Sequence, residues 1–462
     1  MPDFDLTVIG SGPGGYVAAI HAARMGARVA ILEQDVEEWG GTCLNHGCIP
    51  TKSLVQCAEV LRTVRRAREY GISVAEPAID WPAMQGRKDW VVGGMRRGVQ
   101  GLLKANGVEM ITARGRLAGG TRVTADGREM DARAVLLAPG SAVALPPIAG
   151  VERCLTSDSI LGLDHVPTSL LVIGGGVVGM EFAGIFSLLG ARVTVVEMLD
   201  QILAPVDADV ATRFVRLMGA RGVEVHLGAA VEEVARDGDL LCVRFGGGIE
   251  LRAEQVLVAT GRRPNTGDLG LETAGVTTER GAIIVDQHLR TSADGVYAIG
   301  DATGISTLAH TASYQGEVAV TNALGERRIS ADYRAIPACV YTEPEIAYVG
   351  LSEAQARAAR HEVRVGQFPF SALGRAMVLG ETDGFVKVVA DADGYLLGVA
   401  VLGPRATDLI AEAALALNVG ITAAELSHVV HAHPTLPEAI AEAALDVDGR
   451  AVHVAPRRGP GR

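Results

Sequence analysis

The sequence predicts an α/β fold followed by a C-terminal α+β region. Over most of the chain, short buried strand patterns alternate with glycine turns and helical stretches, and one such unit occurs twice. After Tyr341 the pattern changes to alternating strand-like runs and two Ala-rich helices. The length of 462 residues corresponds to roughly three domains.

The repeated unit consists of a strand, a glycine turn, a helix and a second strand that ends in an acid. The first copy starts at residues 6–9 and ends at Glu33, and the second starts at residues 170–173 and ends at Glu197. In both copies the acid lies 23 residues after the first glycine of the turn. The same Gly-Ala-Arg-Val tetrapeptide lies 16 residues after that glycine in each copy. We therefore predict two Rossmann-type units.

The two glycine turns favour dinucleotide binding. Such glycines let the backbone approach a pyrophosphate at a helix N-terminus, and the acid can accept a hydrogen bond from a ribose hydroxyl. The alternative is two ordinary βαβ turns without a ligand, but the matched spacing argues against it. The candidate cofactor-binding residues are Gly10, Gly12, Gly14, Gly15 and Glu33 in the first copy and Gly174, Gly176, Gly179 and Glu197 in the second.

Three further strand patterns end in glycine turns, where α/β sheets place ligands. Residues 134–138 lead into Pro139, residues 255–259 lead to Gly261, and residues 295–299 lead to Asp301. We expect Gly261 to lie at a cofactor site. Asp301 is open to two interpretations, a turn residue or an acceptor for a hydroxyl group.

Helices are also expected outside the repeated units. Residues 55–105 are predicted to be mainly helical, and further helices are expected at 408–417 and 437–445. The basic cluster Arg62, Arg65, Arg66 and Arg68 is interpreted as a solvated helix face without a specific function. Residues 457–462 are expected to be disordered.

Composition excludes several classes of function. The net charge is −12 and aromatic residues make up 4% of the chain, which disfavours binding to nucleic acid and to anionic membranes. The expected location is the cytoplasm, because the N-terminus leads straight into a strand with no basic region or cleavage site.

Cys43 and Cys48 stand in the segment Gly-Gly-Thr-Cys-Leu-Asn-His-Gly-Cys-Ile-Pro-Thr-Lys. A structural disulfide would be unusual in a reducing compartment. A metal site is disfavoured, because no second Cys or His pair follows at ligand spacing. The preferred interpretation is a redox pair at a helix N-terminus, where a thiolate is stabilised. The isolated cysteines Cys57, Cys154, Cys242 and Cys339 are interpreted as structural.

This segment resembles the active-site motif of the flavin-dependent pyridine nucleotide–disulfide oxidoreductases, and within them it is most similar to the dihydrolipoamide dehydrogenases. The resemblance extends over the whole chain through Ala-Thr-Gly-Arg-Arg-Pro-Asn, Thr-Ser-Ala-Asp-Gly-Val-Tyr-Ala-Ile-Gly-Asp-Ala and His-Ala-His-Pro-Thr-Leu-Pro-Glu-Ala. It implies FAD in the first glycine motif and NAD in the second. The implied domains are FAD-binding (1–147), NAD-binding (148–267), central and completing the FAD site (268–340), and the dimer interface (341–462).

The resemblance also implies roles for individual residues. Cys43 resembles the thiol that exchanges with substrate, and Cys48 the thiol that contacts the flavin. Lys52 matches the lysine beside the flavin, and Glu181 the acid that pairs with it. Glu33 matches the acid on the FAD ribose. Asp301 matches the aspartate on the ribityl chain.

His433 and Glu438 match an acid/base pair that the opposite subunit contributes. The residues themselves leave simpler interpretations open. Glu438 has capping-box spacing from Thr435. His433 could be an ordinary interface histidine, and Glu181 could be a favourable acid in a first helical turn.

Two positions depart from the family pattern. His46 stands between the cysteines, where the family often has an apolar residue. Two interpretations are open, a perturbation of the thiol pKa values and a simple position in the loop, and we prefer the second. Pro437 replaces a residue that is often polar, which can alter the start of the following helix.

We expect NAD rather than NADP, because no Lys or Arg follows Glu197 before Arg213. The implied reaction is FAD-dependent oxidation of dihydrolipoamide with reduction of NAD. The implied partners are a second copy of the chain and the lipoyl domain of a 2-oxo acid dehydrogenase complex. The alternatives are an NAD(P)H-dependent reductase of another small disulfide and a non-catalytic flavin-binding subunit.

Overall fold

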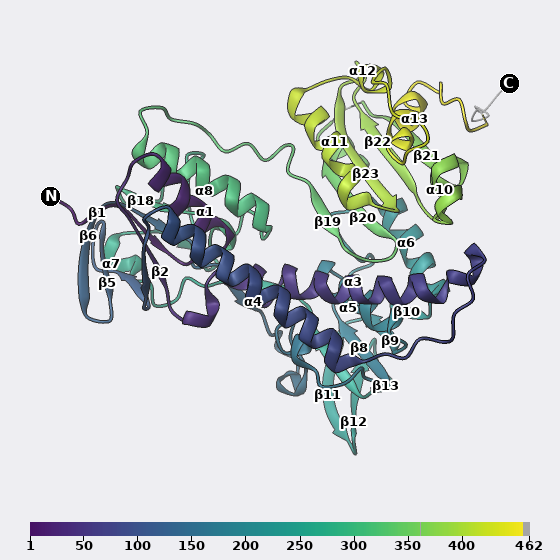
Figure 1. Cartoon of the computed structure of the whole chain (residues 1–462), viewed down its shortest axis with the longest axis horizontal. Coiled ribbons are helices and arrows are strands. Elements are labelled where there is room, and N and C mark those ends of the chain that lie inside the picture. The colour runs from purple at the N-terminus through teal and green to yellow at the C-terminus, as the bar shows by residue number, and fades with distance from the viewer. Residues whose placement is uncertain (361, 456–462) are drawn as a thin grey trace.

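A computed structural model of the chain describes residues 1–360 and 362–455 and shows three sheet-containing modules (Figure 1). The N-terminal module and the C-terminal module lie at opposite sides of the molecule in this view, and the second Rossmann-type module lies below them. The expected α/β class with a C-terminal α+β region is confirmed.

The first module is built on a sheet with strand order β3-β2-β1-β6-β5-β4, and β18 pairs with β6. The strands β1, β2, β3, β6 and β18 are parallel, whereas β4 and β5 form an antiparallel extension. The strand bounds are β1 Phe4–Ile9, β2 Val29–Glu33, β3 Glu109–Thr112, β4 Gly115–Leu117, β5 Arg122–Ala125, β6 Arg128–Leu137 and β18 Val296–Ala298. The helices α1 (Pro13–Arg24) and α8 (Ala309–Leu324) pack against each other beside this sheet.

The second module repeats the first at smaller size. Its parallel sheet has the order β10-β9-β8-β14. The bounds are β8 Ser169–Ile173, α5 Val177–Leu188, β9 Arg192–Val196, α6 Ala208–Ala220, β10 Val223–His226 and β14 Gln255–Val258. A three-stranded antiparallel sheet is attached to it, formed by β11 Val231–Asp237, β12 Leu240–Phe245 and β13 Ile249–Ala253.

The C-terminal module has a five-stranded antiparallel sheet in the order β19-β20-β23-β22-β21. Its strands are β19 Ala338–Val340, β20 Glu345–Gly350, β21 Arg364–Pro369, β22 Phe385–Ala390 and β23 Leu396–Gly403. Its helices are α9 Glu353–Ala358, α10 Gly374–Leu379, α11 Ala406–Val419, α12 Ala423–Ser427 and α13 Glu438–Asp446. The two expected Ala-rich helices correspond to α11 and α13. The segment expected to be disordered lies outside the described residues.

Further short elements complete the described part of the chain. They are α2 Gly41–Asn45, α7 Leu271–Ala274, β7 Ser141–Val143, β15 Arg262–Pro264, β16 Thr278–Glu279 and β17 Ala282–Ile283. β15 pairs with β7, which ties the end of the second module to the first.

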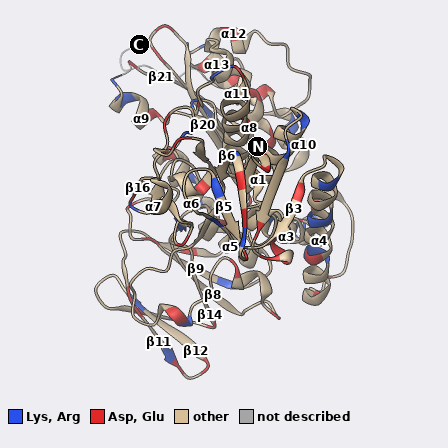
Figure 2. Cartoon of the chain, turned by 90° about the vertical axis from the view of Figure 1, so that its left-hand side faces the viewer, with Lys and Arg blue, Asp and Glu red and all other residues tan. Residues whose placement is uncertain are grey.

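Two long helices, α3 (Cys48–Arg65) and α4 (Trp81–Ala105), account for most of the predicted helical stretch, whereas residues 71–80 between them are not helical. In Figure 1, α3 runs below the C-terminal module and next to α5. The interpretation of its basic cluster as a solvated face is wrong for Arg62 and Arg66. Both guanidinium groups bind Glu381 in the C-terminal module, and Arg62 also lies 3.2 Å from Glu343. In Figure 2, which colours Lys and Arg blue and Asp and Glu red, segments of both colours occur along α4.

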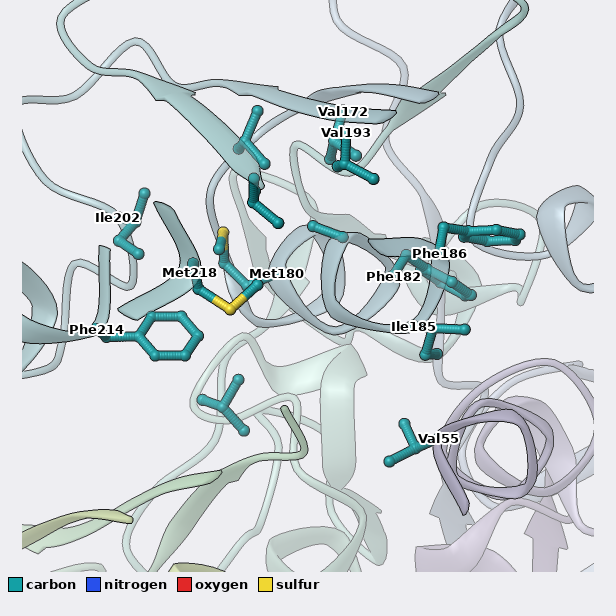
Figure 3. Packing of buried hydrophobic residues seen from close by; sticks show 14 of the residues in the cluster. Val55, Val172, Met180, Phe182, Ile185, Phe186, Val193, Ile202, Phe214 and Met218 are labelled. Atoms are coloured by element: carbon teal, nitrogen blue, oxygen red, sulfur yellow. The ribbon is translucent and has the colours of Figure 1, made fainter. Parts of the chain in front are cut away.

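The largest core cluster surrounds α5, which is apolar on nearly all sides. Figure 3 shows Ile185 of α5 close to Val55 of α3, with Phe182 and Phe186 of the same helix beside Ile185 and Met180 next to Met218 of α6, and all of these residues belong to this cluster. This core therefore holds α3 against the second module. No helix in residues 1–360 or 362–455 has the length and apolar character needed to cross a membrane.

Shortening a side chain in this core should destabilise the fold. Ile185 is 2% exposed, so Ile185→Ala removes buried contacts and leaves a cavity, at an expected cost of about 2–5 kcal/mol. Ile249→Ala is the matched control, because Ile249 is 46% exposed. Urea denaturation followed by circular dichroism should show a lower midpoint for Ile185→Ala only, and equal midpoints for the two variants would contradict the assigned packing.

Candidate active site

Cys43 and Cys48 lie at the junction of two helices. Cys43 belongs to α2, and Cys48 is the first residue of the 18-residue helix α3. Their side chains are hydrogen-bonded to each other, and both are free thiols. A Cβ on the intervening Gly47 would lie 3.1 Å from the Cα of Cys43, so the close turn favours glycine.

The two thiols differ strongly in acidity. The hydrogen bond from Cys43 and the charge of Lys52 outweigh burial and lower the pKa of Cys48 to about 7. The same hydrogen bond, together with burial, raises the pKa of Cys43. The α3 N-terminus also favours an anion at Cys48. In the reduced pair the negative charge therefore resides on Cys48.

Lys52 and Glu181 form an ion pair beside the thiols. Lys52 follows Cys48 by one helical turn, so both side chains emerge on the same face of α3. The Lys52 Nζ atom lies 2.9 Å from Oε1 and 2.7 Å from Oε2 of Glu181 on α5. Glu181 is only 3% exposed, and the backbone N–H of Tyr341 also donates to it at 3.0 Å.

The first glycine turn has the shape of a dinucleotide cradle. Gly10 has φ +102°, and a Cβ on it would lie 2.2 Å from the Ala138 carbonyl oxygen. A Cβ on Gly15 would lie 1.9 Å from the Gly10 oxygen, whereas Gly12 faces open space. Gly14 allows α1 to pack closely on α8, because its Cβ would lie 3.0 Å from the Ala312 oxygen.

Glu33 ends β2 beside this turn. Its carboxylate accepts hydrogen bonds from the backbone N–H and the hydroxyl of Ser11, at 3.1 and 2.7 Å. Burial raises the pKa of Glu33, and the Ser11 hydrogen bonds oppose that rise. The acid is thus fixed at the mouth of the turn.

The second turn repeats this geometry. Gly174 has φ +112°, a Cβ on Gly179 would lie 2.0 Å from the Gly174 oxygen, and Gly176 faces open space. Glu197 accepts a hydrogen bond from the N–H of Gly175 at 2.7 Å, as Glu33 does from Ser11. The helices α1 and α5 both begin after a glycine with no side-chain cap, so their first N–H groups can donate to a phosphate. Both turns therefore fit a dinucleotide.

Asp301 lies at the start of a short helical turn after β18. It accepts a hydrogen bond from the Ser141 hydroxyl, and the Arg262 guanidinium donates to the same hydroxyl at 2.7 Å. Gly261, next to Arg262, also faces open space. The pairing of β15 with β7 brings these residues together at the boundary of the first two modules.

His433 and Glu438 form a second acid/base pair in the C-terminal module. The His433 Nδ1 atom lies 2.8 Å from Glu438 Oε1, and the Thr435 N–H donates to Oε2 at 2.6 Å. Glu438 thus contacts His433 and also accepts the backbone hydrogen bond that capping-box spacing suggests. Within the described part of the chain, no hydrogen bond or ion pair links this pair to Cys43, Cys48, Lys52 or Glu181.

The two departures from the family pattern have simple local effects. His46 Nε2 lies 2.6 Å from Glu38 Oε1, and this hydrogen bond raises the pKa of His46 although burial opposes it. His46 therefore connects the segment between Cys43 and Cys48 to the short helical turn at residues 36–38. Pro437 is the N-cap residue of α13, so the helix begins at Glu438.

Several residues at these sites were not identified from the sequence. They are Ser11 at Glu33, Ser141 and Arg262 at Asp301, and Tyr341 at Lys52 and Glu181. The place of Ser11 inside the glycine turn was a usable signal. No sequence signal pointed to Tyr341, because only tertiary packing brings it to Lys52.

Comparison with known proteins agrees with this geometry. Residues 4–316 match the pyridine nucleotide-disulphide oxidoreductase family model, and residues 336–444 match the dimerisation domain of that family. Together these two segments account for most of the chain.

Individual relatives match over nearly the full chain. Dihydrolipoyl dehydrogenases from Bacillus subtilis and Thermus scotoductus are 39% and 42% identical to it, and each match covers 98% of this chain and 99% of the relative. The solved structure of LpdA from Mycobacterium tuberculosis has a TM-score of 0.88 at 33% identity, covering 95% of this chain and 98% of that one. The flavoprotein disulfide reductase RclA from Escherichia coli has a TM-score of 0.87 at 29% identity, with 95% and 99% covered. The cofactors of the family are FAD and NAD, as the resemblance implied.

Gly15 and Gly179 make the closest contacts within their two turns, so replacing each by alanine should impair one cofactor site and spare the other. Gly15→Ala places a Cβ against the Gly10 oxygen, so we expect a severalfold loss of flavin per chain. Gly179→Ala places a Cβ against the Gly174 oxygen, so we expect weaker NADH binding with flavin retained. Flavin absorbance per chain and NADH titration measure these effects, and each variant is the control for the other. A loss of flavin in both variants to the same extent would contradict the assignment.

The reduced enzyme should alkylate at Cys48 with a pH midpoint near 7, because the thiolate forms above its pKa of about 7. Lys52→Met removes the neighbouring positive charge, so the midpoint should rise. Lys104→Met, at the exposed end of α4, should leave it unchanged. Iodoacetamide labelling followed by peptide mass spectrometry measures these midpoints, and an unchanged midpoint in Lys52→Met would refute the role of that charge.

Proposed function

Because the chain belongs to the pyridine nucleotide-disulphide oxidoreductase family, we propose that it oxidises dihydrolipoamide to lipoamide and reduces NAD, with FAD as bound cofactor. The observation that carries this proposal is the asymmetric thiol pair, with an acidic Cys48 beside Lys52 and a less acidic Cys43. In such a pair the more acidic Cys48 is the better leaving group, so an incoming thiolate attacks the sulfur of Cys43.

Cys43 is the residue that meets the substrate. In the oxidised pair, a dihydrolipoamide thiolate attacks the sulfur of Cys43, the Cys43–Cys48 bond breaks, and Cys48 leaves as a thiolate. The second substrate thiol, after losing its proton, displaces Cys43 and closes the lipoamide disulfide. Two electrons have then passed from the substrate to the cysteine pair. The low pKa of Cys48 makes it the better leaving group.

When bound, FAD would supply the redox chemistry that takes an electron pair from a dithiol and passes it as hydride to NAD. The residues that would hold FAD are the first glycine turn, Glu33, Lys52 and Asp301, and those that would hold NAD are the second turn, Glu197 and Gly261. The sequence has no Lys or Arg between Glu197 and Arg213 that could bind a 2′-phosphate, which supports NAD over NADP.

His433 of the partner subunit would take the proton from the substrate thiol. Within one chain His433 is exposed, with 79% of its side chain accessible, and Glu438 holds its Nδ1 atom. Burial raises the pKa of Glu438, but hydrogen bonds from Thr435 and His433 outweigh it and lower that pKa. A carboxylate fixed on Nδ1 leaves Nε2 to accept the proton.

This arrangement requires a homodimer, and the match to the family's dimerisation domain supports one. We also propose that lipoyl domains of a 2-oxo acid dehydrogenase complex deliver the substrate, and that the enzyme works in the cytoplasm. The division into domains at 1–147, 148–267, 268–340 and 341–462 belongs to the same proposal.

The cysteine and histidine variants provide the decisive test. Cys43→Ser or Cys48→Ser should abolish lipoamide turnover, and His433→Gln should slow it by about 10²–10⁴-fold. All three should retain NADH oxidation with ferricyanide, which bypasses the thiol pair. His165→Gln, on the exposed surface, is the matched control. Substantial turnover without either cysteine would overturn the proposal, and faster turnover of glutathione disulfide than of lipoamide by the unaltered enzyme would favour another small disulfide as substrate.

A further inference from the structure

Tyr341 lies against the ion pair that neighbours the redox cysteines. Its ring centroid is 4.6 Å from the Lys52 Nζ atom, and its backbone N–H donates to Glu181 Oε1 at 3.0 Å. Tyr341 follows β19 in the C-terminal module, whereas Lys52 lies on α3 and Glu181 on α5. One residue of the C-terminal module thus contacts both members of the pair.

The backbone at Tyr341 is held firmly. Val340 is 0% exposed in the largest core cluster, and Thr342 is 3% exposed with its hydroxyl bonded to the Pro344 carbonyl. Glu343 lies 3.2 Å from Arg62, further along α3. The segment that carries Tyr341 therefore contacts α3 at two points and presents a fixed ring to Lys52.

The Tyr341 ring occupies a defined side of the ammonium group. Lys52 directs hydrogen bonds to both oxygens of Glu181, and the ring lies close to the same nitrogen. A cation near an aromatic face gains about 0.5–2 kcal/mol, depending on its exposure. Because a lysine side chain is long and flexible, such a contact restricts where its charge can lie.

We propose that Tyr341 is a positioning residue that fixes the Lys52 ammonium beside Cys48, so that the C-terminal module controls how readily Cys48 becomes a thiolate. This inference rests on the proposed thiol chemistry and adds a residue to it. The phenol acts through its ring face, and burial raises the pKa of Tyr341 to about 12, so the ring stays neutral. The ionisable groups that influence this site are Cys43, Lys52 and Glu181 around Cys48, and Cys339, Glu345 and Glu181 around Tyr341.

The test compares Tyr341→Leu, which removes the ring, with Tyr341→Phe, which keeps it. Both are made in a Cys43→Ser background, where the hydroxyl can still donate to Cys48. The readout is the pH midpoint of Cys48 alkylation by iodoacetamide, resolved by peptide mass spectrometry. We expect the Leu variant to raise the midpoint by about half a pH unit, which lowers labelling at pH 7 about twofold. The Phe variant should have the same midpoint as the Cys43→Ser parent. Lys52→Met in the same background removes the charge altogether and should give the largest shift of the midpoint.

Two results would overturn the proposal: an unchanged midpoint in Tyr341→Leu, or an equal shift in Tyr341→Phe. Tyr341→Met repeats the test with another apolar side chain if the Leu variant does not fold. The midpoint does not depend on lipoamide turnover. If the enzyme with Cys43 intact cannot oxidise dihydrolipoamide, a shifted midpoint in the Cys43→Ser background removes the proposed substrate and keeps the role of Tyr341. If the enzyme with Cys43 intact turns over lipoamide, an unchanged midpoint in that background keeps the substrate and removes the role of Tyr341.

Discussion

The buried ion pair between Lys52 and Glu181 is the interaction on which the site depends. Glu181 lies in the most apolar helix of the chain, where an unpaired carboxylate would be strongly disfavoured. Lys52 compensates this charge from α3, and the same ammonium lowers the pKa of Cys48. The pair thus joins the folding of the second module to the chemistry of a cysteine in the first.

The helix α3 extends this connection to the C-terminal module. Cys48 and Lys52 lie at its beginning, and Arg62 and Arg66 bind Glu381 near its end. Lys387, which is 2% exposed, provides a separate link, because it pairs with Asp207 and Asp209 of the second module. Charged groups at these boundaries are paired, as expected where desolvation makes an isolated charge costly. The redox helix is therefore held from both ends.

The two glycine turns have the same backbone geometry, because the same steric constraints act on both. Each begins with a glycine at positive φ and includes a later glycine whose Cβ would collide with the carbonyl oxygen of the first. In each copy the acid at the end of the next strand accepts a hydrogen bond from the second residue of the turn. Between them, Gly12 and Gly176 keep open the space that a pyrophosphate needs. The common geometry follows from the backbone, so it does not require the helices α1 and α5 to have the same side chains.

The sequence by itself determined the features that depend on local spacing. The glycine turns, the acids Glu33 and Glu197 and the redox pair Cys43–Cys48 lie within short segments, where the strand and helix periods fix relative positions. The resemblance to a family supplied roles for distant residues such as His433 and Asp301. Only the tertiary structure decided that Arg62 and Arg66 bind Glu381, and that Tyr341 lies over Lys52. Contacts of this kind join segments hundreds of residues apart, and they arise from how whole modules pack, which no local pattern of residues encodes.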